Sequence, residues 1–258
     1  MAQTPKQRAA AERARAQREL AAREKRKHRQ RLYALAAGIL SLILVGTLAF
    51  TAIRGHQEPT ATEPAPPLQD GPVAMAETAP SPTLAQGRTW TATLETTAGD
   101  IVIELDGAAA PQAVASFIAL AREGFFAGTL CHRLTTAGIF VLQCGDPTAT
   151  GTGGPNFRFG PIENAPADDI YVAGTLAMAR QGAGGVGPEA AATSMGSQFF
   201  LVYEDSMIPS DAAGGYTVFG HITSGLEIVQ AIAAAGVSGG ASDGRPAVDI
   251  TIEGVTVQ

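Results

Sequence analysis

The chain has 258 residues and a net charge of −6, but this average conceals two unlike parts. Residues 1–31 hold eleven of the 18 Lys and Arg residues with three acids, whereas the chain from Arg88 onward has six arginines and 17 acids. This split indicates that one polypeptide occupies two environments. The two cysteines and four histidines lack the spacing of common metal ligands, so we expect no metal site.

The basic arm of residues 1–31 includes the run "RARAQRELAAREKRKHRQR". It has no interleaved aromatic residues and it adjoins a hydrophobic segment, so we do not expect it to bind nucleic acid. Two roles stay open: contact with anionic lipid, or a solvated flank that sets the orientation of the chain.

The hydrophobic segment, Leu32–Ile53, is 22 residues long and has no charge. As a helix it would span roughly 33 Å at ~1.5 Å per residue, enough for a hydrocarbon core of about 30 Å. A cleaved signal peptide is the main alternative, with "TLA" at 47–49 as its cleavage site, but the preceding basic region and the apolar stretch are both long for one. We expect a single-pass transmembrane helix.

Basic residues beside a span stay in the cytoplasm. Eleven precede this span and only Arg54 follows it at once, so the arm of residues 1–31 is predicted to be cytoplasmic and the C-terminal domain extracytoplasmic. Residues 54–87 are rich in proline and poor in core-forming side chains, which is typical of a disordered linker.

Residues 88–258 are long enough for one domain that buries about 70% of its unfolded surface. "TWTATLETTAGDIVIEL" predicts two strands joined at Ala98-Gly99, and "APQAVASFIALAREGFF" predicts a helix that begins near Pro111 and ends at Gly124. A second helix is expected over 225–236. Six further strands are expected, at 130–134, 140–144, 174–180, 198–203, 217–222 and 248–257.

Two helices for eight strands are too few to form alternating βαβ units. The pattern predicts a mainly β fold, an antiparallel barrel or sandwich with two packed helices.

The run Cys131-His132-Arg133 first suggests a hydrolase. If 130–134 is a strand, however, Cys131 and His132 point to opposite faces and cannot form a nucleophile–base pair. We therefore interpret His132 as a satisfied core or edge residue. "GDPTATGTGGP" lacks the Gly-Lys-Ser/Thr ending of a phosphate-binding loop, and its glycines are better explained by tight turns.

An arginine, an apolar stretch and a glutamine remain, together with "GSQFF" at 196–200. Phe199 and Phe200 alternate faces, so one is expected in the core while the other can line a surface pocket. Spacing alone assigns no catalytic role to these residues.

Five blocks in order, "FFAGTLCHRL", "FVLQCGDPTATGTGGP", "GTLAMA", "GSQFFLVY" and "YTVFGHI", resemble the cyclophilin-type peptidyl-prolyl cis–trans isomerases over about residues 91–257. The resemblance implies an eight-stranded antiparallel barrel capped by two helices, with a shallow groove for proline-containing polypeptides and no cofactor. A reaction that breaks no bond needs no nucleophile, which explains the composition of the site.

By position, the resemblance implies that Arg133 is catalytic and that Gln143 holds a carbonyl. It implies that a further set lines the substrate groove: Phe140, Val141, Ala179, Gln198, Phe200, Ile208 and Tyr216.

This chain departs from the family pattern at several places. Two extra residues between Arg133 and Gln143 predict a bulged turn, and Arg180 stands where many members have asparagine. The stretch 181–195 is longer than usual. No tryptophan lies near Ile208, which implies weak binding of cyclosporin.

If Arg133 and Gln143 face one pocket, Cys131 shares that face while Cys144 takes the other, so we expect no disulfide between them. The whole sequence predicts a membrane-tethered isomerase that acts on exported or cell-surface proteins and is anchored in the bilayer through Leu32–Ile53. The main alternative is a non-catalytic domain that binds proline peptides as a holdase chaperone.

Overall fold

The computed structural model describes residues 77–258. The expected cytoplasmic arm, the span at 32–53 and most of the linker lie outside these residues. Within 77–258, no helix is both long enough and apolar enough to cross a bilayer.

The ordered domain begins before the expected boundary at Arg88. Pro82–Ala85 form a short 3-10 helix, η1, in which Ala85 is fully buried. The Trp90 indole N–H donates to the Ala85 carbonyl at 2.8 Å, and the Gln112 amide donates to the Pro80 carbonyl at 2.9 Å. Proline-rich composition predicts a linker here, but these tertiary contacts hold the segment against the domain.

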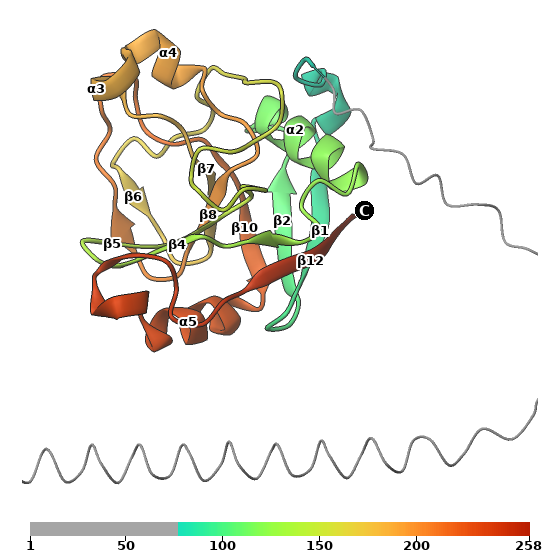
Figure 1. Ribbon diagram of the computed structural model, residues 1–258. Helices are drawn as coiled ribbons and strands as arrows, with labels where there is room; N and C mark the ends of the chain where they lie inside the picture. The colour runs from blue at the N-terminus through green and yellow to red at the C-terminus, as the bar shows by residue number, and fades with distance from the viewer. Residues whose placement is uncertain (1–76) are drawn as a thin grey trace, which may run out of the picture. The chain divides into compact units, whose positions relative to one another are not determined.

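The described domain is mainly β, with few helices (Figure 1). Eight strands have four or more residues: β1 Thr89–Thr96, β2 Ile101–Asp106, β4 Arg133–Ala137, β5 Ile139–Cys144, β7 Thr175–Met178, β8 Phe199–Val202, β10 Val218–Ser224 and β12 Thr251–Val257. Four more have two residues each: β3 Thr129–Leu130, β6 Ile170–Tyr171, β9 Ser206–Met207 and β11 Asp243–Gly244.

All strand pairs are antiparallel, and ten strands form one curled sheet in the order β11-β4-β5-β8-β7-β10-β2-β1-β12-β3. An isolated bridge between Leu130 and Asp146 links the β3 end of this order to the residues after β5. β6 and β9 pair separately. The predicted count of eight matches the longer strands. The two-residue strands carry too little alternation to be recognised in a sequence.

The hairpin of β4 and β5 differs from expectation. Arg133 pairs with Gln143 and Ala137 pairs with Ile139 in an unbroken register, so the predicted bulge is absent from this hairpin. Gly138, at φ +80°, supplies the left-handed turn between the two arms.

Both expected helices are present, α2 at Pro111–Arg122 and α5 at Leu226–Ala235. In Figure 1, α2 lies at the upper right and α5 at the bottom, and buried residues of both helices belong to one core cluster. Shorter helical segments are α3 Ala183–Val186, α4 Pro188–Ala192 and the 3-10 segment η2 Ser238–Gly240. α3 and α4 lie within the long stretch 181–195.

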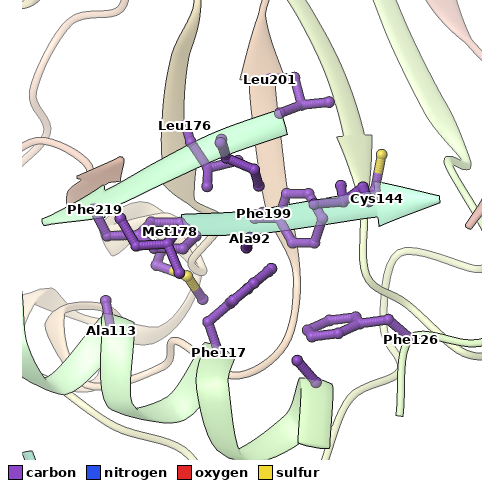
Figure 2. Packing of buried hydrophobic residues seen from close by; sticks show 14 of the residues in the cluster. Ala92, Ala113, Phe117, Phe126, Cys144, Leu176, Met178, Phe199, Leu201 and Phe219 are labelled. Carbon is purple, nitrogen blue, oxygen red and sulfur yellow. The ribbon is translucent and has the colours of Figure 1, made fainter. Parts of the chain in front are cut away.

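The buried face of α2 packs onto the inner face of the sheet through aromatic side chains (Figure 2). Phe117 of α2 stacks on Phe126 at 5.0 Å between ring centroids and meets the edge of Phe199 of β8 at 5.7 Å. Both rings of β8 are buried, but Phe199 belongs to this core and Phe200 to a separate apolar cluster on the other face. The predicted alternation of faces between these two phenylalanines is therefore confirmed.

Candidate active site

Three neighbouring strands place the candidate catalytic residues in a row on the outer face of the sheet. Arg133 of β4 lies opposite Gln143 of β5, and Gln143 lies opposite Phe200 of β8. Because directly opposed residues of antiparallel strands point to the same side, this register brings the three side chains together. Leu134 and Leu142, one residue further along each strand, point into the core.

A chain of hydrogen bonds runs along this row. Arg133 Nη1 donates to Gln143 Oε1 at 3.3 Å, and Gln143 Nε2 donates to Gln198 Oε1 at 2.8 Å. Gln198 Nε2 then donates to the Gly153 carbonyl at 2.9 Å. The side chains of Gln143 and Gln198 therefore form a polar strip. Arg133 lies at one end of this strip and the 146–153 loop at the other.

Asp146 fixes the loop that ends this strip. Its buried carboxylate accepts hydrogen bonds from the Thr148 hydroxyl and from four backbone N–H groups, those of Thr148, Thr150, Gly151 and Gly153, at 2.6–3.1 Å. Burial alone would raise the pKa of Asp146, but the hydrogen bonds at Thr148, Gly153 and Gly151 together lower it below its ordinary value. A Cβ at Gly153 would overlap this carboxylate, so glycine is required there.

The arginine is anchored on its other side by Asp243 of β11. Arg133 Nε and Nη2 donate to the two carboxylate oxygens at 2.8 and 2.7 Å. Hydrogen bonding to Asp243 raises the pKa of Arg133 and the same contact lowers the pKa of Asp243, so both groups are charged at neutral pH. The Nη1 group remains directed at Gln143.

An apolar cluster lies beside the polar strip. Val141, Phe200 and Ile208 are its buried members among the predicted residues, and Ala179 and Tyr216 pack against it. Tyr216 meets the ring of Phe200 edge to face at 5.5 Å. Five of the seven predicted groove residues therefore lie in this cluster or pack against it, and Gln198 lies in the polar strip.

Phe140 is the predicted groove residue that lies apart. It precedes Val141 in β5 and so points to the opposite face, where its ring contacts Tyr203 at 6.0 Å between centroids. Phe140 packs against the main core. Strand alternation thus places it away from Phe200, contrary to the expectation from the resemblance.

A cleft of about 290 Å³ adjoins the polar strip. Its walls include Gln143, Gln198 and Ala179, and the long stretch 181–195 contributes Gln181 and Ser194. The stretch 181–195 therefore forms part of the wall of this cleft, which shares Gln143, Ala179 and Gln198 with the predicted site.

Arg180 lines the same cleft, but its guanidinium is already paired with a carboxylate of the protein. Its buried side chain donates two hydrogen bonds to Asp211, at 3.0 and 2.9 Å, and further ones to the carbonyls of Gly214 and Gly215. The guanidinium also lies 4.7 Å from the centre of the Tyr216 ring. Arg180 therefore connects the cleft to Asp211 and to the segment that leads to Tyr216.

The two cysteines form a disulfide, so the prediction that they remain unbonded is wrong. That prediction treated 130–134 as one strand. The chain instead leaves the strand geometry at residues 131–132, between β3 and β4, and the face of Cys131 does not follow from that of Arg133. Both cysteines are buried in the core, with their Cα atoms 3.9 Å apart. The bonded Cys131 sulfur offers no thiolate, which removes the hydrolase alternative.

The interpretation of His132 as a satisfied residue also needs correction. Both its ring nitrogens are shielded from solvent and neither has a hydrogen-bond partner. Burial lowers the pKa of His132, which favours the neutral ring.

Sequence reasoning missed Asp243 and Asp146. Asp243 lies 110 positions from Arg133, on a strand of two residues, so no local pattern connects them. Asp146 had a recognisable signal, because an aspartate that begins a Thr- and Gly-rich loop commonly accepts backbone hydrogen bonds.

Within residues 77–258, no group of three or more His, Cys, Asp and Glu side chains is arranged to hold a metal ion.

Comparisons with known proteins bear on this geometry. Residues 91–257 match the family described as cyclophilin type peptidyl-prolyl cis-trans isomerase/CLD. Over 204 residues the chain is 41% identical to a Mycobacterium tuberculosis protein named "Probable peptidyl-prolyl cis-trans isomerase B", a match that covers 74% of this chain and 61% of that protein. The protein of the same name from Mycobacterium leprae is 40% identical over 207 residues, with 76% and 63% covered.

Among solved structures, a Cryptosporidium parvum cyclophilin type peptidyl-prolyl cis-trans isomerase is 27% identical, with a TM-score of 0.54. That match covers 66% of this chain and 98% of the other. The chain spans a little over three-fifths of the length of the mycobacterial relatives. Since the family match extends over most of the described domain, the chain belongs to the cyclophilin-type peptidyl-prolyl cis–trans isomerase family.

Proposed function

We propose that this domain accelerates cis–trans rotation about X–Pro bonds, and that Arg133 stabilises the twisted amide. Rotation must overcome a barrier of roughly 18–20 kcal/mol that arises from amide resonance. As the amide twists, the proline nitrogen regains its lone pair, and a guanidinium N–H can then donate to it. Such a contact forms mainly in the transition state and so lowers the barrier.

The observation that carries this proposal is the position of the Arg133 guanidinium. It is held by Asp243 on one side and Gln143 on the other, next to the apolar cluster around Phe200. A proline ring placed on that cluster would bring its nitrogen towards the guanidinium. The amide of Gln143 would hold a neighbouring carbonyl while the other side of the bond turns.

A non-catalytic proline-peptide binder would share the groove but would not need a fixed guanidinium. The two functions are separated by measuring both properties of the purified full chain in detergent. Exchange between the cis and trans forms of a short Ala-Pro peptide is followed by NMR, and binding of the same peptide by titration. We expect faster exchange at substoichiometric protein; saturable binding with an unchanged exchange rate would establish the holdase alternative instead.

We further propose that Leu32–Ile53 anchors the chain in the cell membrane, with the domain extracytoplasmic and acting on exported or cell-surface proteins. The charge asymmetry on the two sides of the segment supports this orientation. The disulfide supports it too, because such bonds persist in oxidising compartments. Protease added to intact cells should digest the domain while a cytoplasmic marker survives; full protection of both would contradict the orientation.

A further inference from the structure

Asp243 reaches the candidate catalytic arginine through strand register. It lies in β11 directly opposite Thr135 of β4, and Thr135 is two residues from Arg133. Residues two apart in a strand share a face, and opposed residues on adjacent strands point the same way. The carboxylate is therefore presented on the outer face, beside the guanidinium.

The contact is bidentate and open to solvent. Both carboxylate oxygens accept from the guanidinium, at 2.8 and 2.7 Å, and the two side chains are 41% and 53% exposed. An exposed ion pair of this kind contributes little to folding stability. Its effect lies instead in fixing the plane of a long side chain that would otherwise sample many rotamers.

The direction in which the arginine is fixed is the significant feature. Asp243 takes the Nε and Nη2 edge, which leaves Nη1 to donate to Gln143. A carboxylate outside the polar strip therefore determines which N–H group of the guanidinium is directed at the strip. Small losses of alignment between a donor and a reacting atom reduce the rate of an oriented step substantially.

We infer that Asp243 is the positioning residue of Arg133, which it aligns for the twisted X–Pro amide without itself touching the substrate. This inference rests on the proposed function of the site.

The chain offers a matched control. Asp249 accepts two hydrogen bonds from Arg245, at 2.9 and 2.7 Å, and both side chains are more than half exposed. This pair has the same chemistry as the pair of Asp243 with Arg133. Neither Arg245 nor Asp249 belongs to the lining of the cleft or to the polar strip.

The test uses the full chain in detergent, with kcat and KM measured separately on the Ala-Pro peptide. Asp243→Ala and Asp243→Asn should lower kcat about tenfold with KM changed less than twofold, because alignment matters in the twisted state more than in binding. Asp243→Glu, which restores the carboxylate, should recover most of the loss. Asp249→Ala should behave as the parent, and thermal unfolding should show that all variants are folded.

A double-mutant comparison separates this inference from the proposed function. In a chain that already carries Arg133→Ala, adding Asp243→Ala should have no further effect, since the carboxylate acts through the arginine. If Arg133→Ala is impaired but Asp243→Ala matches the parent, the positioning role is refuted while the proposed function stands. If the parent does not accelerate exchange, or if Arg133→Ala is as active as the parent, both fail.

Discussion

Phe200 and Phe140 have the same side chain but different surroundings. Phe200 lies in the apolar cluster beside Gln143, whereas Phe140 packs against Tyr203 on the other face of the sheet. Phe200 is buried and Phe140 is half-buried, and their different surroundings should give two different phenotypes. This difference allows the proline-binding surface to be located by substitution.

We expect Phe200→Ala to weaken peptide binding and raise KM at least severalfold, because the proline ring loses its apolar contact. Phe140→Ala should leave KM unchanged. Both should lower the free energy of unfolding, Phe200→Ala by about 3 kcal/mol, as large-to-small changes at buried sites do. Titration with an Ala-Pro peptide and urea unfolding check the pair; equal effects on KM would show that the two faces are wrongly assigned.

At the scale of elements, the disulfide ties Cys131, which directly follows β3, to Cys144, the last residue of β5. Strands β4 and β5 carry Arg133 and Gln143, so the bond fixes the end of the hairpin at which these candidate residues lie. The bonded residues are 13 positions apart. Closing a loop of about this length stabilises a fold by about 3 kcal/mol.

Replacing both cysteines, Cys131→Ala with Cys144→Ala, should therefore lower the free energy of unfolding by about 3 kcal/mol. Reductant should lower the melting temperature of the parent but not that of the double variant. Calorimetry with and without reductant measures both effects. A parent melting temperature that does not respond to reductant, with the thiols shown to be reduced, would contradict this role.

The loop 146–153 depends on a single ionised carboxylate. The pKa of Asp146 is lower in the folded protein than its ordinary value of 3.8, so the folded state binds fewer protons than the unfolded state as the pH falls. The stabilisation is present above pH 4 or so and is lost as the pH drops through the folded pKa.

Asp146→Asn should lower the free energy of unfolding at pH 7 by about 2 kcal/mol, since charge-assisted hydrogen bonds to the loop are lost. It should also flatten the acid side of the stability curve compared with the parent. Urea unfolding from pH 7 to pH 3 tests this. Parallel curves for parent and variant would mean that the Asp146 carboxylate is not the group that titrates.

For the whole molecule, the longer elements and the faces of β8 could be predicted because period-two alternation and helix boundaries are local signals. The resemblance located Arg133 and Gln143, and the register then showed them paired. The disulfide and Asp243 could not be predicted in the same way. One depends on a two-residue break between strands, and the other on a two-residue strand distant in the sequence.

Phe140 shows the limit of position matching. The resemblance assigns it by sequence position, but Phe140 and Gln143 are three residues apart in one strand, and such residues point to opposite faces. In this chain the register is regular, so Phe140 alternates away from Val141 and Gln143. Strand alternation therefore places its side chain beside Tyr203 and outside the cluster of Phe200.

The central claim is that Arg133 lowers the barrier to X–Pro rotation, and Arg133→Ala tests it most directly. Cis–trans exchange of a short Ala-Pro peptide is measured by NMR for the parent, Arg133→Ala and Arg133→Lys, with circular dichroism as the check on folding. We expect Arg133→Ala to lose about a hundredfold in rate, on the order of 3 kcal/mol, while much of the peptide binding remains. Lysine should restore little, because an ammonium lacks the planar fork. A folded Arg133→Ala that turns over as fast as the parent would contradict the claim.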